Sequence, residues 1–370
     1  MPLFIELKIK TLPEYVSVMM DDARNYGYSM PDENRMLLVN WLVVVAFLVF
    51  CMVVLGGVTR LTNSGLSMVE WKPVTGWLPP LSEQAWMDEF EKYKAFPEYQ
   101  KINKGMSLDE FKGIFAFEYA HRVLGRIIGL AFFVPLVLFA LMRTIPVHML
   151  PRLLGLLVLG GSQGVMGWIM VKSGLVDHPD VSHYRLTAHL GLASLILAAL
   201  VWTALEVRSP AIRKVQNSTV TNWSKVVLAL VFLQILVGGF VAGLNAGFVY
   251  NDWPTMGGGF VPDDIFYMTP WYLNFVENVA TIQFTHRLVA YLLFGVALWL
   301  FYLCRRRAGA QSKKLAHWMM AAVVLQIFLG IWTLISVVPV SLGAFHQAGG
   351  MIVLISSVML VHSLTRQQIK

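Results

Sequence analysis

Two histidine–arginine pairs stand at the start of long apolar runs, at His121–Arg122 and at His286–Arg287. Ionisable side chains inside a membrane are costly, so they indicate function by default. Glu118 precedes the first histidine by three residues, which places both side chains on one face of a helix. The corresponding position of the second copy is Gln283, which cannot exchange protons at ordinary pH. We interpret this difference as a sign that one half performs chemistry while the other carries electrons.

Two further histidines, His189 and His346, stand near the start of other apolar runs. Opposed imidazoles without a carboxylate or thiolate cluster nearby suit the two axial positions of a haem iron. A single intramembrane histidine is often only hydrogen-bonded to a neighbouring helix, but four in matched positions favour iron ligands. His183 is an alternative ligand to His189, although it precedes the apolar run.

The charged neighbours of these histidines have two interpretations each. Arg122 and Arg287 suit pairing with a haem propionate, or their side chains extend to the lipid headgroups. Glu118 is either a proton donor or acceptor beside a cofactor, or a hydrogen-bond partner that fixes His121 or Arg122.

The composition places the chain among multi-spanning membrane proteins. The mean hydropathy is +0.61, and 14% of the residues are charged. A net charge of +7 is explained by basic cytoplasmic loops, so nucleic-acid binding is not indicated. The two cysteines, Cys51 and Cys304, both fall in apolar runs and indicate neither a disulfide framework nor a thiolate metal site.

Eight apolar runs of about 20 residues have the length of membrane-spanning helices. They cover residues 36–58, 115–142, 152–171, 186–206, 225–244, 284–304, 315–336 and 344–364. Residues 1–35 lack an apolar core and resemble neither a signal nor a transit peptide, so we predict a cytoplasmic tail. In the long loop 59–114, the region 82–100 mixes aromatic and charged residues and predicts an amphipathic helix.

The distribution of basic residues predicts that both termini are cytoplasmic. Lys and Arg gather between spans four and five and between spans six and seven, whereas loops 245–283 and 337–343 have none. The positive-inside rule therefore places the latter two loops outside. With this orientation all four histidine-bearing spans start at the outer face, so the histidines lie at one depth.

The chain contains an internal repeat of four spans. Matched features are the pairs Gly56–Gly57 and Gly238–Gly239, Asn63 and Asn245, Trp71 and Trp253, and the motifs Gln163-x-x-x-Gly167 and Gln326-x-x-x-Gly330. An even number of spans per unit makes the repeats parallel. We therefore predict an all-α membrane protein of two four-helix bundles, covering 36–206 and 225–370 and joined by a cytoplasmic linker, 207–224. Small residues at such positions allow close helix packing or room for a flat ring.

These motifs resemble the haem A synthase family. The similarity rests on Glu118-x-x-His121-Arg122, its echo at His286–Arg287, the paired His189 and His346, and the stretches 56–67 and 71–76. It covers nearly the whole chain from about residue 36. Members of this family oxidise the C8 methyl group of haem O to the formyl group of haem A, the cofactor of terminal oxidases.

The resemblance implies a role for each half. A haem b would be held in the C-terminal half by His286 and His346, with Arg287 nearby. The substrate haem O would bind near His121, His189 and Arg122, with Glu118 catalytically important. Haem O would be handed over by haem O synthase, and the electron donor and any homo-oligomer are left open.

The chain departs from one branch of that family. Some bacterial members carry a cysteine pair in the first outer loop, and residues 59–114 contain none. The sequence is therefore similar to the proteobacterial and mitochondrial branch, and we expect a bacterial inner membrane with haem sites near its periplasmic face. The rival hypothesis is a dihaem b-type electron-transfer protein resembling a quinol oxidoreductase. A transporter with parallel repeats would leave the matched histidines unexplained.

Overall fold

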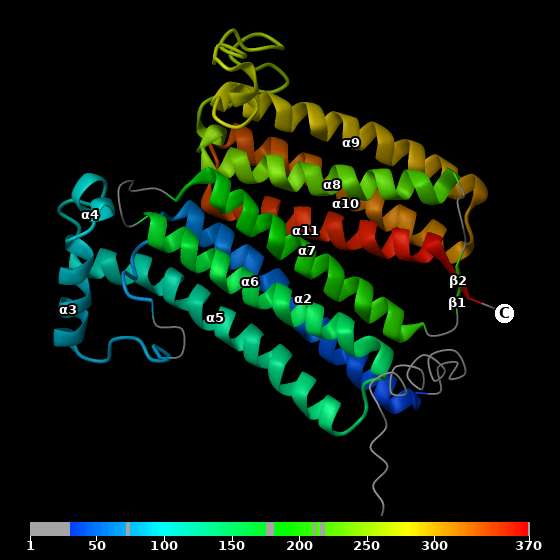
Figure 1. Ribbon diagram of the computed structural model, residues 1–370. Helices are drawn as coiled ribbons and strands as arrows, with labels where there is room; N and C mark the ends of the chain where they lie inside the picture. The colour runs from blue at the N-terminus through cyan, green and yellow to red at the C-terminus, as the bar shows by residue number, and fades with distance from the viewer. Residues whose placement is uncertain (1–29, 72–74, 175–180, 210–211, 215–218, 369–370) are drawn as a thin grey trace, which may run out of the picture.

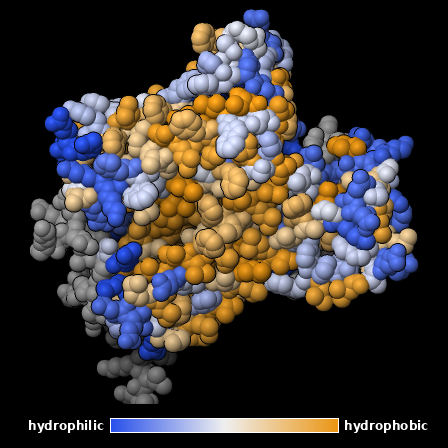
Figure 2. Space-filling view, turned by 180° about the vertical axis from the view of Figure 1, so that it is seen from behind, coloured by the Kyte–Doolittle hydropathy of each residue, from blue (hydrophilic) through white to orange (hydrophobic). Residues whose placement is uncertain are grey.

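The computed structural model describes residues 30–71, 75–174, 181–209, 212–214 and 219–368. Within this part of the chain, eight helices are long and apolar enough to cross a membrane, which confirms the predicted all-α class and the eight predicted spans. They are α2 (Asp32–Leu61), α5 (Leu108–Leu141), α6 (Leu150–Gly174), α7 (His183–Arg208), α8 (Thr219–Gly243), α9 (Val279–Arg307), α10 (Ala310–Ile335) and α11 (Val340–Thr365). Figure 2 shows a hydrophobic band between two hydrophilic ends.

Local sequence signals explain where several helices begin and end. Ser107 and Glu110 form a reciprocal capping box at the start of α5, which satisfies backbone N–H groups that have no partner within the helix. The side chain of Asn278 accepts a hydrogen bond from the backbone of Thr281 at the start of α9, at 3.1 Å. Three arginines occupy the last turn of α9, where cations interact favourably with the helix dipole.

Four helices form the centre of the molecule and four surround it (Figure 1). Helices α2, α7, α8 and α11 pack against one another, and α5, α6, α9 and α10 each pack on one of them. In an apolar 18-residue stretch of α7, 56% of the residues are buried, whereas the corresponding shares for α5 and α6 are 11% and 6%. Each half therefore has two central and two outer helices, and α5 and α6 face outward most.

The loop after α2 forms a small helical cap on the end of α5. It contains α3 (Glu83–Lys94) and α4 (Pro97–Lys101), which lie together beside the start of α5 (Figure 1). Phe90 and Tyr93 of α3 are buried against Phe111 and Phe115 of α5. The predicted amphipathic helix is confirmed, and α5 extends outward to Leu108 to meet it. The other connections contain the 3₁₀ turns η1 (Val147–Met149), η2 (Ala246–Phe248) and η3 (Trp271–Phe275).

The opposite end of the bundle joins the two halves through a short sheet that the sequence does not predict. Strand β1 (Ile212–Lys214) lies in the predicted linker and pairs antiparallel with β2 (Arg366–Gln368). Beside it, the buried carboxylate of Glu206 on α7 forms ion pairs with Arg152 on α6 and with Arg366. The end of α11 is therefore held against the N-terminal half.

Candidate functional site

Each of the four predicted ligand histidines lies against a glycine of a neighbouring helix. A Cβ atom at that glycine would lie 3.1 Å from Cε1 of the ring for Gly56 and His121, 3.2 Å for Gly167 and His189, 3.3 Å for Gly238 and His286, and 2.8 Å for Gly330 and His346. Real Cβ atoms rarely approach so closely, so a larger side chain would displace each ring. The glycines of the repeated motifs thus make room for imidazoles.

The two histidines of the C-terminal half face each other across the bundle. The ring centroids of His286 on α9 and His346 on α11 are 6.5 Å apart, with the ring planes at 69°. Two imidazoles that each place a nitrogen about 2 Å from a shared metal ion have centroids on the order of 6 Å apart. The separation therefore fits a metal ion between the rings.

The histidines of the N-terminal half occupy the equivalent places on α5 and α7. His121 lies on α5 beside Gly56 of α2, and His189 lies on α7 beside Gly167 of α6. The ring nitrogen Nδ1 of each is buried and has no hydrogen-bond partner within the described residues. Unpartnered buried polar atoms are rare in folded proteins and point to a missing ligand.

Three glutamines hold the histidine-bearing helices. The amide nitrogen of Gln163 donates to the backbone oxygen of His189 at 3.1 Å, and that of Gln326 donates to the backbone oxygen of His346 at 2.8 Å. Gln234 makes the same contact with His286 at 3.1 Å. Gln234 was not among the predicted residues, although Gln234 and Gly238 have the same spacing as the motifs Gln163-x-x-x-Gly167 and Gln326-x-x-x-Gly330.

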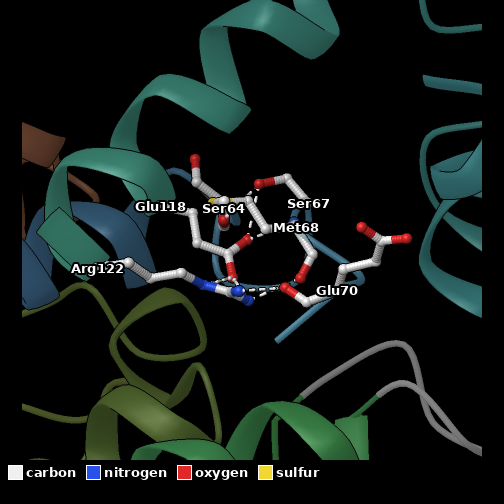
Figure 3. A network of polar contacts seen from close by, with 6 residues as sticks. All are labelled: Ser64, Ser67, Met68, Glu70, Glu118 and Arg122. Atoms are coloured by element: carbon white, nitrogen blue, oxygen red, sulfur yellow. Dashed lines mark hydrogen bonds and ion pairs between the residues drawn. The ribbon is translucent and has the colours of Figure 1, made fainter. Parts of the chain in front are cut away.

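Glu118 is a buried carboxylate whose two oxygens both accept hydrogen bonds (Figure 3). Its Oε2 accepts from the Ser67 hydroxyl at 2.7 Å and from the backbone N–H of Met68 at 2.8 Å. Its Oε1 accepts from Nε and Nη2 of Arg122, at 3.0 and 2.5 Å. Of the two alternatives for a structural role, the structure selects Arg122 as the partner rather than His121.

The guanidinium groups of Arg122 and Arg287 fasten the outer loops to the bundle. Arg122 donates to the backbone oxygens of Met68 and Glu70, at 2.6 and 2.7 Å (Figure 3). Arg287 donates in the same way to Tyr250 and Asp252, at 3.5 and 3.0 Å. These carbonyl groups occupy matching positions of the two repeats, since each pair precedes the matched tryptophan by the same number of residues.

The acid and the amide at matching positions therefore interact with their loops with opposite polarity. In the first half Glu118 accepts from the Met68 N–H at 2.8 Å, whereas in the second half Gln283 donates to the Tyr250 oxygen at 2.9 Å. The Nε of Arg122 is used by Glu118, but the Nε of Arg287 is buried and has no partner among the described residues. Among the residues that the structure describes, a buried carboxylate follows this pattern in the first half, as Glu118, and an amide takes its place in the second, as Gln283.

The remaining histidines lie away from these pairs. His183, the alternative ligand, lies at the start of α7 with its Nε2 3.5 Å from a carboxylate oxygen of Glu277. His317 contacts the backbone oxygen of Lys313, and His362 is buried beside Trp202. His148 lies in η1, and His178 is outside the described residues.

No group of three or more histidine, cysteine or acidic side chains that could hold a bare metal ion occurs in the part of the chain that the structure describes. Paired imidazoles on facing helices of a bundle instead suit the axial positions of a haem, whose macrocycle supplies the other iron ligands. The glycines beside the rings and the two unpartnered nitrogens fit such a group.

Comparison with known proteins identifies relatives over almost the whole chain. Residues 39–358 match the COX15-CtaA family, described as cytochrome oxidase assembly protein. A protein named "Heme A synthase" from Parvibaculum lavamentivorans is 52% identical over 335 residues, covering 90% of this chain and 96% of the relative. Proteins of that name from Nitrosospira multiformis and Paramagnetospirillum magneticum are each 48% identical and cover 88% of this chain and 93% of the relative.

Proposed function

The chain belongs to the COX15-CtaA family of cytochrome oxidase assembly proteins, and we propose on that premise that it is a haem A synthase that converts haem O to haem A within the membrane. The observation that carries the proposal is the facing pair His286 and His346, with a centroid separation of 6.5 Å. That separation fits two axial ligands of one iron, and the same arrangement of histidines and glycines recurs in the other half.

The two halves have different tasks in this proposal. His286 and His346 would hold a haem b, which supplies one-electron transfer when it is bound. His121 and His189 would hold the substrate haem, because their half alone has a buried carboxylate, Glu118, three residues before a ligand. Arg122 and Arg287 act by fixing the outer loops over the two sites, through their bonds to backbone oxygens.

The proposed reaction oxidises the C8 methyl group of haem O to a formyl group. Two successive hydroxylations of that carbon give a geminal diol, which loses water to form the aldehyde. Each hydroxylation would take one oxygen atom from dioxygen, and the other oxygen atom would leave as water with two electrons and two protons from the donor. Overall the methyl carbon loses two hydrogen atoms and gains one oxygen atom, which is a four-electron oxidation. The protein contributes by orienting the macrocycle, excluding water and transferring protons, while the iron chemistry belongs to the haem.

Proton transfer is the role that we assign to Glu118. Its Oε2 is hydrogen-bonded to Ser67, whose hydroxyl has a second acceptor in the backbone oxygen of Ser64, at 3.2 Å. The hydroxyl can therefore turn away from Glu118 without losing its hydrogen bond, which leaves Oε2 free to take up a proton. Gln283 offers no such group in the other half.

The location follows the sequence prediction. Both termini would lie in the cytoplasm of a bacterial cell, and the four histidines would lie near the periplasmic face of the inner membrane. Haem O is an amphiphile that would arrive from the enzyme that makes it, and a separate donor would exchange electrons with the haem b.

Expression in a host that makes haem O but no haem A tests the proposal. Extracted pigment should contain haem A when the chain is present and only haem O when it is absent. The Glu118→Gln variant, which copies the second half, should accumulate haem O or a hydroxylated intermediate. A chain that co-purifies with two unmodified b haems and yields no haem A would instead be the dihaem electron-transfer protein.

A further inference from the structure

The four histidine sites share a glutamine on the glycine-bearing helix, with one exception. Four residues before the glycine that faces the ring, the chain has Gln163 for His189, Gln234 for His286 and Gln326 for His346, but Met52 for His121. Four residues is one helical turn, so all four side chains project toward the turn that carries their histidine. His121 is therefore the one site of the four without an amide.

The glutamines restrain the histidines that they accompany. Besides the bonds to the backbone oxygens, the amide nitrogen of Gln234 lies 3.2 Å from Nδ1 of His286, and that of Gln326 lies 3.1 Å from Nδ1 of His346. The amide oxygens of all three glutamines are buried and have no partner among the described residues. Such an oxygen suits the ring N–H that a metal-bound histidine commonly donates to a neighbouring group.

Met52 provides neither interaction at His121. A thioether has no hydrogen to donate and is only a weak acceptor. The Met52 methyl group instead lies 3.4 Å from where a Cβ atom at Gly125 would be, one turn beyond His121 on α5. Nδ1 of His121 is buried and unpartnered within the described residues. The ring thus sits against Gly56 without an amide beside it.

The helices that carry the two N-terminal ligands also differ in how firmly they are packed. His189 lies on α7, where 56% of the residues in an apolar 18-residue stretch are buried, whereas His121 lies on α5, where that share is 11%. In the C-terminal half α9 and α10 pack extensively against each other, while α5 and α6 touch at few places. His121 therefore lacks the bond to its backbone oxygen that Gln163 makes with His189, and the helix of His121 is the less buried of the two.

We propose that His121 is the exchangeable ligand of the substrate iron, that His189 is the permanent one, and that Met52 permits the exchange. This inference rests on the proposed function, because only a substrate haem must enter, react and leave in every turnover. The step breaks the dative bond between the His121 nitrogen and the iron, and the electron pair stays on the nitrogen, so no electron or proton is transferred. The braced pair His286–His346 suits a haem that stays bound.

The first test compares Met52→Gln, which adds the missing amide, with the size-matched control Met52→Leu. The proteins are purified from a host that makes haem O and are reduced, and carbon monoxide binding is followed by absorption. Because the gas binds only after a ligand leaves, Met52→Gln should slow binding on the order of tenfold, while Met52→Leu should bind like the parent. Equal rates in Met52→Gln and the parent would overturn the proposal.

The second test measures which histidine retains the haem. His121→Ala should keep haem O at the parent's stoichiometry and shift its spectrum to high spin, whereas His189→Ala should lose it. The reverse result would overturn the ligand assignment but leave the proposed function standing. If neither variant changes the haem O content or spectrum while haem b and the elution volume stay normal, the substrate site itself is wrong, and the proposed function fails with it.

Discussion

Glu118 and Arg122 form an ion pair across one turn of α5, and only 4% and 8% of their side chains are exposed. The same arginine donates to the backbone oxygens of Met68 and Glu70, and the same carboxylate accepts from the backbone N–H of Met68. The proposed catalytic acid is therefore also part of the device that fixes the loop over its site. Experiments on Glu118 must separate these two roles.

Glu118→Gln should impair both stability and conversion of haem O. Removing one partner of a buried ion pair typically costs about 3–5 kcal/mol, because the remaining charge is left unpaired. We expect a lower thermal unfolding midpoint in detergent and an accumulation of haem O in cells. Arg122→Gln breaks the same ion pair but keeps the carboxyl group, so it serves as the control. Equal pigment ratios in the two variants at equal stability would argue against proton transfer by Glu118.

Gly330→Ala should remove the haem of the C-terminal half. The new methyl group would lie 2.8 Å from Cε1 of His346, so the ring must move, and such overpacking costs about 1–3 kcal/mol. Gly238→Ala, at 3.3 Å from His286, should have a weaker effect. Gly295→Ala on α9 meets nothing within 4 Å and is the control. Haem content per protein measures the effect, and an unchanged content in Gly330→Ala would contradict the proposed ligand position.

Acid should loosen the turn at residues 252–258, to which Arg287 donates a hydrogen bond at Asp252. Backbone N–H groups of the turn, that of Gly257 first, lower the pKa of Asp252 to about 2. Since an unperturbed aspartate titrates near 3.9, the ionised carboxylate stabilises the turn above about pH 4. That stabilisation is lost as the pH falls from about 4 to about 2. In the parent protein, the rate at which an acid-active protease cleaves this loop should rise as the pH falls from about 4 to about 2.

Asp252→Asn provides the comparison for the acid experiment. The amide cannot ionise, so cleavage in this variant should change little between pH 4 and pH 2 beyond the protease's own pH dependence. A parent loop that is cut at the same rate at both pH values would show that the carboxylate does not hold the turn.

Glu206→Gln should loosen the junction between the C-terminal strand and the N-terminal half. Glu206 is buried and forms ion pairs with Arg152 and Arg366, whose side chains are 48% and 22% exposed. Because both arginines reach solvent, we expect the free energy of unfolding to fall by about 1–3 kcal/mol, which is less than the loss expected for a fully buried pair. The control is Glu91→Gln, since its pair with Lys94 is exposed and such pairs contribute about 0–1 kcal/mol. A lower thermal unfolding midpoint in Glu206→Gln, together with an unchanged haem content, would support a purely structural role for Glu206.

Much of this protein could be predicted from the sequence because its main signals are local. A run of apolar residues long enough to span a bilayer must form a helix there, since the backbone has no other hydrogen-bond partners in lipid. The eight helices follow from that rule, and the spacing between Glu118 and His121 fixes their common face. The matched motifs likewise predict the four histidines, which lie near the starts of α7, α9 and α11 and further along α5, whose first turns pack on the helical cap.

Contacts between distant segments were decided only by the tertiary structure. The sequence left Arg122 and Arg287 between haem propionates and lipid headgroups, and only the structure shows that both also donate to loop carbonyls more than 30 residues away. Gln234 and Met52 each lie on a helical turn beside a histidine-bearing helix, and only the packing of the helices places them there. Such contacts depend on how each helix is rotated and packed against its neighbours, and no single run of residues encodes that rotation.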